Sequence, residues 1–270
     1  MLKMVNPLFY LTLFFIRSAS LHAGGKIGGW GQSVLATAVA TTTLLFPLSA
    51  LRADPKPEPG WREIWTGADA SSHVWLLYSG MTVAPYGHIF SDGLRLRIAG
   101  GYGGYSYVGN RRGQLTSFNA ETAFAEALVG YLKRLGPLTA RAFVGVAAIE
   151  HDIEPFDPEN PVQGQEFGPK LVTELWVNMG ASADLSWTSA HQTSAARLRT
   201  GYRVYGDVSL GLEAGLNANR MGEDARAGLF GRYAWDGGEF SLATGFSGRF
   251  LEDAQSLQDP YATVNWLTQF

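Results

Sequence analysis

The sequence is poor in features that soluble proteins and helical membrane proteins usually carry. It has no cysteine, and only 17% of its residues are charged, against about 25% in a typical soluble domain. The lack of cysteine suits a protein of the cell envelope, although many cytosolic proteins also lack it. Beyond the N-terminus, no uninterrupted apolar run reaches the roughly 18 residues that a spanning helix needs. The composition therefore argues against both classes.

Glycine and aromatic residues are abundant instead. The chain has 33 glycines, 15 phenylalanines, 11 tyrosines and 8 tryptophans. In a chain with little charge and no apolar helix, this combination favours a transmembrane β-barrel.

The N-terminal 53 residues have the composition of an export leader. They contain four basic residues and no acidic one, and the apolar stretch 34–48 is followed by Ala50 and Ala53, small residues suited to cleavage. A membrane anchor helix over 34–53 is the alternative, which Pro47 disfavours. The predicted organisation is a signal peptide or leader at 1–53, a Pro-rich periplasmic tail at 54–60 and a single barrel domain at 61–270.

The charge balance of the remaining chain is acidic. Without the first 53 residues, 17 basic residues stand against 24 acidic ones, a net charge of about −7. This balance argues against a nucleic-acid partner. The basic residues after position 54 comprise 14 arginines and only three lysines.

The last ten residues, 261–270, predict the closing strand of an outer-membrane barrel. One face of this strand is largely apolar and consists of Ala262, Val264, Trp266, Thr268 and Phe270. The other face is mostly polar, and the chain stops on the aromatic Phe270. Outer-membrane barrels alternate in this way, with apolar residues toward lipid and polar residues toward the lumen. We therefore expect Trp266 and Phe270 to form a membrane-insertion signal.

Similar period-two alternation recurs along the chain, with no competing helical stripe. Strands are expected near 93–108, 117–134, 138–153, 171–179, 183–191, 196–205, 208–219, 225–236, 239–251 and 261–270. Short links alternate with longer ones, the latter at 109–115, 155–170, 220–224 and 252–260. Segment 62–83 forms two further strands, with a reversal near 70–72, or caps the lumen. The prediction is an all-β, antiparallel up-and-down transmembrane barrel of twelve strands, with ten as the alternative.

The polar faces of these strands are unusually rich in arginine, which suits crowded, partly buried pairing. The candidates for lining the lumen are Arg95, Arg97, Tyr105, Tyr107, Arg141, Glu174, Arg197, Arg199, Arg203, Glu213, Arg226, Arg232 and Arg249. Glu174, Asp184 and Glu213 are inward-facing acids that could pair with these arginines. Two alternatives stay open: an interior that favours anions, or one closed by salt bridges. Tryptophans near strand ends predict interfacial girdles, namely Trp65, Trp75, Trp176, Trp187, Trp235 and Trp266.

No catalytic residue, metal ligand or cofactor site is predicted. His191 with Ser189 and Ser194 comes nearest to a catalytic dyad, but polar loop residues explain the pattern better. His151, Asp152 and Glu154 alternate faces on one strand, which is unsuited to a metal site. The glycines at 100–104 lack the following helix of a phosphate-binding loop. They are expected to leave room for neighbouring aromatic rings.

Several segments resemble the cellulose biosynthesis protein BcsS family. The similar stretches are WTGAD at 65–69, YSGMTVAPYG at 78–87, DGLRLR at 92–97, GGYGGYSY at 100–107 and ARLRTGYRV at 196–204, with the closing Phe270. The likeness covers roughly 60–270 and includes no catalytic signature. It implies an envelope protein of bacterial cellulose production, located in the outer membrane.

The favoured hypothesis is a non-enzymatic outer-membrane barrel that assists cellulose biosynthesis through export, passage or surface retention of a β-glucan. Its partners would be outer-membrane lipid, a β-glucan chain and components of the cellulose synthase complex. One alternative is a structural or docking barrel with a plugged lumen. Another is an outer-membrane enzyme that modifies lipid or polysaccharide, with a Ser–His pair at one rim.

Overall fold

The computed structural model describes residues 60–177, 180–248 and 259–270. The predicted leader, almost all of the predicted tail, and Arg249 lie outside the described residues. The strands are β1 Arg62–Ser71, β2 Val74–Val83, β3 Gly93–Arg111, β4 Gln114–Leu135, β5 Leu138–Glu154, β6 Gly164–Val177, β7 Ala181–Thr188, β8 Ser194–Tyr205, β9 Val208–Asn219, β10 Gly222–Trp235, β11 Gly238–Gly248 and β12 Asp259–Gln269. A short 3₁₀ turn, η2 at Ala190–Gln192, follows β7.

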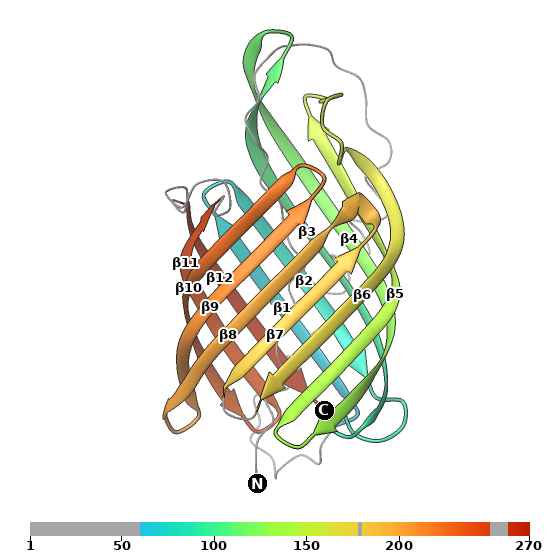
Figure 1. The fold of residues 1–270 in the computed structure, drawn as a ribbon, viewed down its shortest axis with the longest axis vertical. Helices are drawn as coiled ribbons and strands as arrows, with labels where there is room; N and C mark the ends of the chain where they lie inside the picture. Colours follow the sequence, from blue (N-terminus) through green and yellow to red (C-terminus); the bar gives the residue numbers. More distant parts are fainter. Residues whose placement is uncertain (1–59, 178–179, 249–258) are drawn as a thin grey trace.

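The strands form one closed antiparallel barrel. Each strand pairs with its sequence neighbours, and β12 pairs with β1 from Glu63↔Gln269 to Ser71↔Tyr261. Figure 1 shows the strands tilted around a single wall, with the C-terminus at the lower end. The prediction of twelve strands is confirmed, because 62–83 forms the hairpin β1–β2 and does not cap the lumen. Within the described ranges, no helix is long and apolar enough to cross a membrane.

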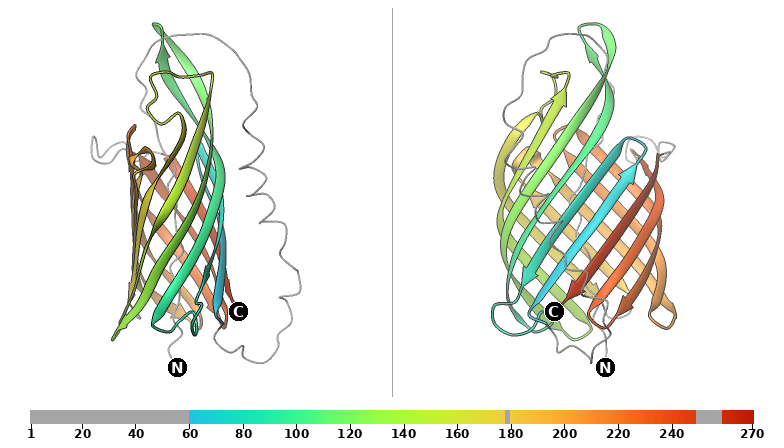
Figure 2. Two further views of the ribbon diagram at one scale, coloured as in Figure 1. Left: turned by 90° about the vertical axis from the view of Figure 1, so that its right-hand side faces the viewer. Right: turned by 180° about the vertical axis from the view of Figure 1, so that it is seen from behind.

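The upper wall on one side of the barrel is taller than predicted. β3 and β4 stay paired up to Arg111↔Gln114, so most of the expected 109–115 loop is strand. Likewise β6 begins at Gly164, which shortens the expected 155–170 loop to 155–163. Figure 2 shows the β3–β4 hairpin rising above the rest of the barrel. The sequence missed the extension because its outer positions are not regularly apolar, so the membrane-strand pattern fades there.

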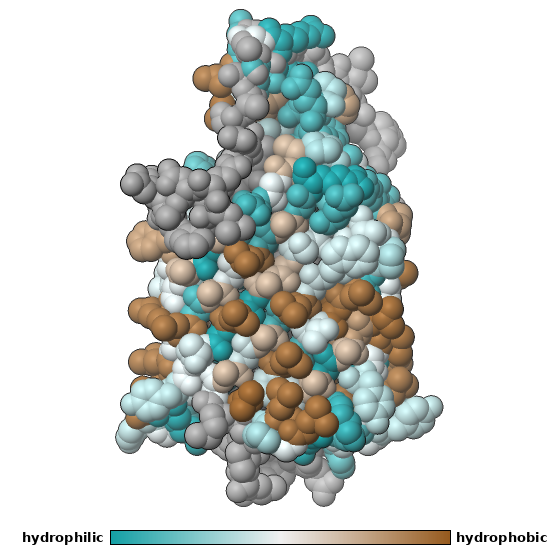
Figure 3. Space-filling model, viewed as in Figure 1, coloured by the Kyte–Doolittle hydropathy of each residue, from teal (hydrophilic) through white to brown (hydrophobic). Residues whose placement is uncertain are grey.

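The outer wall carries the apolar face of each strand. Leu96 and Ile98 of β3 are about half exposed, at 43% and 55%, whereas their neighbours Arg95 and Arg97 are buried. β9 shows the same alternation, with Leu210 and Leu212 outward and Ser209 and Glu213 inward. Apolar side chains spread across the middle and lower part of the surface, while the top is mostly polar (Figure 3). This belt is the lipid-facing surface of an outer-membrane barrel.

Aromatic rings mark the two edges of the belt. Trp75 and Tyr102 contact each other on the outer wall with ring centroids 5.6 Å apart. Near the lower end, Trp266 contacts Trp235 with centroids 5.0 Å apart. The prediction was wrong for Trp65 and Trp176, because both point inward and are 4% and 5% exposed. Each tryptophan lies two residues from an inward glutamate and therefore on the same, inner face of its strand. The alternation of side chains, and not the position near a strand end, decides which way these rings point.

Glycines on the inner wall make room for large side chains, as the sequence predicted for 100–104. A Cβ atom on Gly101 would lie 2.1 Å from the Phe124 ring and 2.7 Å from the Leu77 carbonyl oxygen. Gly80 gives similar room to Trp65. An aromatic ring that covers a glycine on the next strand excludes water from the backbone at that point. These pairs help to set the register of neighbouring strands.

Candidate functional site

The lumen is the candidate site because charged side chains from many strands converge there. In each strand every second residue points inward, and these positions hold most of the buried arginines and carboxylates. A buried charge is costly unless it is paired and hydrogen-bonded. The ion pairs therefore determine what the interior can do.

A first group of ion pairs, the lower network, consists of Glu63, Arg97, Arg141 and Glu174. The Arg141 Nη1 atom lies 2.5 Å from Glu63 Oε1, although three strands separate β5 from β1 in the barrel. The Arg97 Nη1 atom lies 2.7 Å from Glu174 Oε1, and the Arg141 Nε atom lies 3.2 Å from Glu174 Oε2. All four side chains are at most 2% exposed. The network thus links distant parts of the wall through the interior.

Aromatic rings flank the same arginines. The Arg97 guanidinium lies over the Phe143 ring at 3.8 Å, and the Arg141 guanidinium lies 4.9 Å from the Trp176 ring centre. Both contacts have cation–π geometry, which adds to the ion pairs where water is excluded. The inward position of Trp176 therefore has a local role in holding Arg141.

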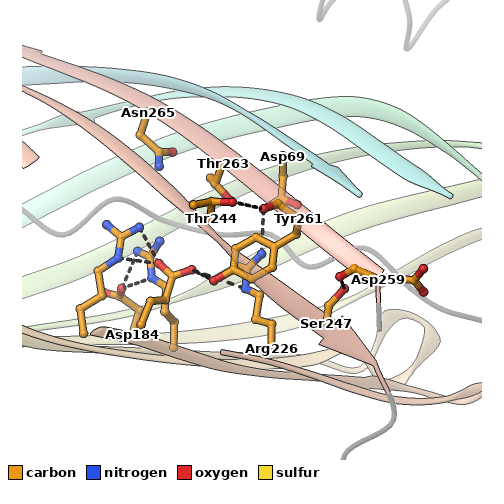
Figure 4. Close-up of polar contacts among 12 residues, drawn as sticks. Asp69, Asp184, Arg226, Thr244, Ser247, Asp259, Tyr261, Thr263 and Asn265 are labelled. Carbon is orange, nitrogen blue, oxygen red and sulfur yellow. Dashed lines mark hydrogen bonds and ion pairs between the residues drawn. The ribbon is translucent and has the colours of Figure 1, made fainter. Parts of the chain in front are cut away.

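A second group, the upper network, consists of Asp69, Asp184, Arg197, Arg199, Glu213 and Arg226, together with Tyr261 and Thr263 (Figure 4). It connects the four strands β7, β8, β9 and β10 with β1 and β12. The Arg197 Nη2 atom lies 2.6 Å from Asp184 Oδ2, and the Arg199 Nη2 atom lies 2.6 Å from Glu213 Oε2. The Glu213 carboxylate also accepts a hydrogen bond from the Tyr261 hydroxyl at 3.1 Å. Neighbouring strands are thereby tied together on the inner face.

The upper network reaches across the barrel through Arg226. Its Nη1 atom lies 2.8 Å from Asp69 Oδ2 on β1, with two strands between β10 and β1. The Thr263 hydroxyl donates to the same Asp69 oxygen at 2.8 Å. The Arg226 guanidinium lies over the Tyr261 ring at 5.0 Å.

The two networks balance in charge. They contain five arginines, 97, 141, 197, 199 and 226, and five carboxylates, 63, 69, 174, 184 and 213. A cavity between Asp184, Arg197, Asn217 and Arg226 has a volume of about 10 Å³, which is room for roughly one water molecule. A larger cavity of about 280 Å³ lies at the upper ends of β8, β9 and β10. The lumen contacts are thus dominated by paired charges, not by an excess of positive charge.

The match to a protein family decides the identity of the chain. The model of the family described as cellulose biosynthesis protein BcsS matches residues 64–270. The chain belongs to the BcsS family. Its fold is a barrel of the outer-membrane type, and its apolar belt places it in the outer membrane. No curated protein matches the chain.

Solved structures similar to this BcsS-family barrel include two porin structures and an autotransporter domain. The KdgM porin has a TM-score of 0.43 and 11% identity, covering 77% of this chain and 99% of that chain. A KdgM porin in complex with disordered oligogalacturonate has a TM-score of 0.43 and 13% identity, with the same coverage. The translocator domain of autotransporter NalP from Neisseria meningitidis has a TM-score of 0.45 and 13% identity, covering 87% and 93%.

The predicted lumen residues of the BcsS-family chain fall into different environments. Arg97, Arg141, Glu174, Arg197, Arg199, Glu213 and Arg226 belong to the two networks, while Tyr105 and Tyr107 are buried on the upper wall. Arg232 is partly exposed, with its Nε atom 4.0 Å from Glu239 Oε2. Arg203 is exposed at the lower end of β8. The predicted lumen residues did not include Glu63 and Asp69. Once 62–71 is recognised as a strand, the alternation of side chains places both of them on its inner face.

Arg95 has a separate role at the lower end of the barrel. Its side chain is fully buried and donates to the carbonyl oxygens of His88 at 3.1 Å, Ile89 at 2.9 Å and Ser91 at 2.5 Å. These three residues belong to the 84–92 loop between β2 and β3. Arg95 therefore fastens the 84–92 loop to the lower end of the barrel.

The closing Phe270 and Trp266 both lie on β12 or directly after it, at the lower end. Phe270 exchanges two backbone hydrogen bonds with Arg62, of 3.1 Å and 3.2 Å. The Arg62 guanidinium also lies 4.4 Å from the Phe270 ring centre. The last residue therefore extends the β1–β12 seam by one pair.

Two histidines that the sequence placed in separate motifs meet at the upper end. The ring centroids of His151 on β5 and His191 in η2 are 5.0 Å apart. Asp152 is exposed on the opposite strand face from His151, so His151, Asp152 and Glu154 do not converge on one site. No group of three or more potential metal ligands occurs in the part of the chain that the structure describes. The sequence could not bring His151 and His191 together because 40 positions separate them.

Proposed function

We propose that this barrel supports bacterial cellulose biosynthesis without catalysis, as a structural or docking component with a closed lumen. The supporting observation is the pair of contacts, Arg141–Glu63 and Arg97–Glu174, that connects non-adjacent strands through the interior. A β-glucan chain in transit would have to separate these buried charges. Removing one partner of such a pair typically costs about 3–5 kcal/mol. Passage along this route is therefore disfavoured.

The docking role draws on the shape and composition of the barrel. The lipid-facing belt anchors the chain, while the tall β3–β4 hairpin stands above it with mostly polar outer positions (Figures 1 and 3). Components of the cellulose synthase complex and the β-glucan itself are the proposed partners of this exposed wall. The absence of catalysis is also part of the proposal. The His191 ring faces His151 and Glu166, and among the residues that the structure describes it forms no Ser–His pair with Ser189 or Ser194.

Conductance in planar bilayers tests the closed lumen. The purified barrel is expected to show no steady conductance, and adding cello-oligosaccharide should change nothing. The double variant Glu63→Ala, Arg141→Ala removes both partners of a cross-lumen pair and should raise conductance. The matched control Asp92→Ala, Lys133→Ala removes an exposed pair of 2.5 Å outside the lumen and should stay silent.

A steady wild-type conductance that cello-oligosaccharide blocks would contradict the closed lumen and favour passage of a glucan. A separate experiment addresses the cellulose role. Deletion of the protein should reduce cellulose at the cell surface, and expression of the wild-type chain should restore it. Full complementation by His151→Phe and His191→Asn would count against an enzyme built on these histidines, whereas loss of cellulose in properly assembled variants would favour one.

A further inference from the structure

The two buried histidines at the upper end belong to a polar cluster that the lumen networks do not use. We define the rim cluster as Tyr105, His151, Glu166, His191 and Arg220. It joins β3, β5, β6, the β7–β8 turn and the β9–β10 turn. On the outer face of β5, Asp152 and Glu154 are exposed at this level, so the cluster stands above the apolar belt.

The imidazoles themselves are removed from water. His151 is 1% exposed and His191 is fully buried, and their rings meet edge to face at 73°. The Tyr105 hydroxyl lies 3.2 Å from His151 Nδ1. The His191 Nδ1 atom is 3.7 Å from the nearest Glu166 oxygen, beyond hydrogen-bond distance. The site is thus built to hold two neutral rings in contact.

The surrounding charges are already engaged with one another. Glu166 pairs with Arg220, whose Nη2 atom lies 3.0 Å from Glu166 Oε2. The same carboxylate accepts a hydrogen bond from the His191 backbone N–H at 2.8 Å. The Arg220 backbone N–H donates to the His191 carbonyl oxygen at 3.2 Å. Glu166 therefore lies beside the His191 ring with its negative charge offset by Arg220.

The cluster also holds the 155–163 loop. The Arg220 Nη1 atom lies 3.5 Å from the Pro161 carbonyl oxygen. Earlier in the loop, Asp157 accepts a hydrogen bond from the Tyr107 hydroxyl at 2.7 Å, and the Asn160 side-chain amide donates to the same hydroxyl at 2.9 Å. The loop therefore covers the upper aromatic row, in which the Tyr107 and Phe118 rings stack 4.9 Å apart.

We propose that the rim cluster is an acid-sensitive latch. At neutral pH it holds the 155–163 loop and the β7–β8 turn against the upper wall. When His151 and His191 take up protons, two positive charges face each other in a buried space, and the loop and turn are released. Release exposes the aromatic row of Tyr105, Tyr107 and Phe118 to the medium.

The direction of the pH effect follows from the environment of the rings. Burial and, as a smaller effect, the charge of the neighbouring His191 together lower the pKa of His151 to about 3. Burial also lowers the pKa of His191, although the Glu166 charge opposes this effect. A group with a lowered folded-state pKa is protonated more readily in the open state. The closed latch is therefore stable above about pH 6.5 and weakens as the pH falls from there toward 3.

Hydrogen–deuterium exchange on the full barrel in lipid nanodiscs tests the latch. Between about pH 7 and about pH 4.5, protection of amides in 155–163 and 189–193 should fall at least tenfold after correction for intrinsic rates. Amides in the lower halves of β8 to β10 should keep their protection. Unchanged protection in the loop and turn would overturn the proposal.

Variants separate the histidines from general acid effects. The double variant His151→Phe, His191→Asn should lose the pH dependence, and asparagine suits the left-handed backbone of His191, whose φ is 49°. The matched control His88→Asn changes an exposed histidine and should keep the full effect. A double variant that keeps the pH dependence would overturn the latch. If the variant does not assemble, wild-type imidazole titration by NMR decides, and ordinary titration of both buried rings near 6.5 would overturn it.

Discussion

Arg97 on β3 and Glu174 on β6 form a fully buried ion pair, with Nη1 and Oε1 2.7 Å apart and neither side chain exposed. Two strands lie between them in the barrel, so the pair fixes the relative position of non-neighbouring strands. Because Glu174 also forms an ion pair with Arg141, it is the shared counter-charge of two arginines. The stability of the lower barrel should therefore be sensitive to this carboxylate.

Glu174→Ala should destabilise the barrel by about 3–5 kcal/mol, because it removes the buried carboxylate that the Arg97 and Arg141 guanidinium groups share. Urea unfolding in lipid vesicles, followed by tryptophan fluorescence, measures the effect. The double variant Arg97→Met, Glu174→Leu should lose less than Glu174→Ala, since it also removes one of the two guanidinium groups. An unchanged unfolding midpoint for Glu174→Ala would mean that the lower network contributes little to stability.

Gly101→Ala should cost about 1–3 kcal/mol, because the new Cβ would overlap both the Phe124 ring and the Leu77 backbone oxygen. Gly231 is a matched control from another strand, where an added Cβ would meet its nearest neighbour, Leu210, at 3.4 Å. Gly231→Ala should leave the unfolding midpoint nearly unchanged. Equal losses for the two variants would show that loss of glycine itself, and not the overlap, is responsible.

Removal of Phe270 should slow insertion of the barrel, since it deletes the last backbone pair of the β1–β12 seam. The fraction of folded protein can be followed by its heat-modifiable gel mobility after mixing with vesicles. Trp266→Phe keeps an aromatic ring at the lipid interface and should insert at close to the wild-type rate. Normal insertion without Phe270 would remove this residue from the predicted insertion signal.

Arg95→Met should loosen the 84–92 loop, because three carbonyl oxygens lose their common donor. Limited proteolysis reports the change, since Tyr86 in this loop is 77% exposed. Cleavage there should accelerate on the order of tenfold, as expected for the loss of about 1.4 kcal/mol of hydrogen bonding. Arg203→Met alters an exposed arginine and should leave the cleavage rate unchanged.

The sequence was sufficient to predict the barrel and most of its faces. Alternation along 208–219 places Leu210 and Leu212 outside and Glu213 inside, as the structure has them. Glycines at 100–104 likewise pointed to the space that Phe124 occupies. These predictions succeed because the side-chain period of a strand depends only on local geometry.

The partners of the inward residues could not be predicted in the same way. Parity places Arg141 in the lumen, but its contact with Glu63 depends on how twelve strands close and tilt. The meeting of His151 with His191 has the same origin, because it depends on the position of a turn. For the tall wall, the limiting factor was different: above the lipid, selection for an apolar outer face no longer applies, and the strand signal weakens.

The unequal strand lengths give the barrel a front and a back. β4 has 22 residues and β7 has 8, so their lengths differ by roughly 45 Å at about 3.3 Å per residue. A molecule approaching along the cell surface meets a tall wall of the barrel from one direction and a low wall from the other. A neighbour in the envelope therefore finds a different height of wall to contact on each side of this protein.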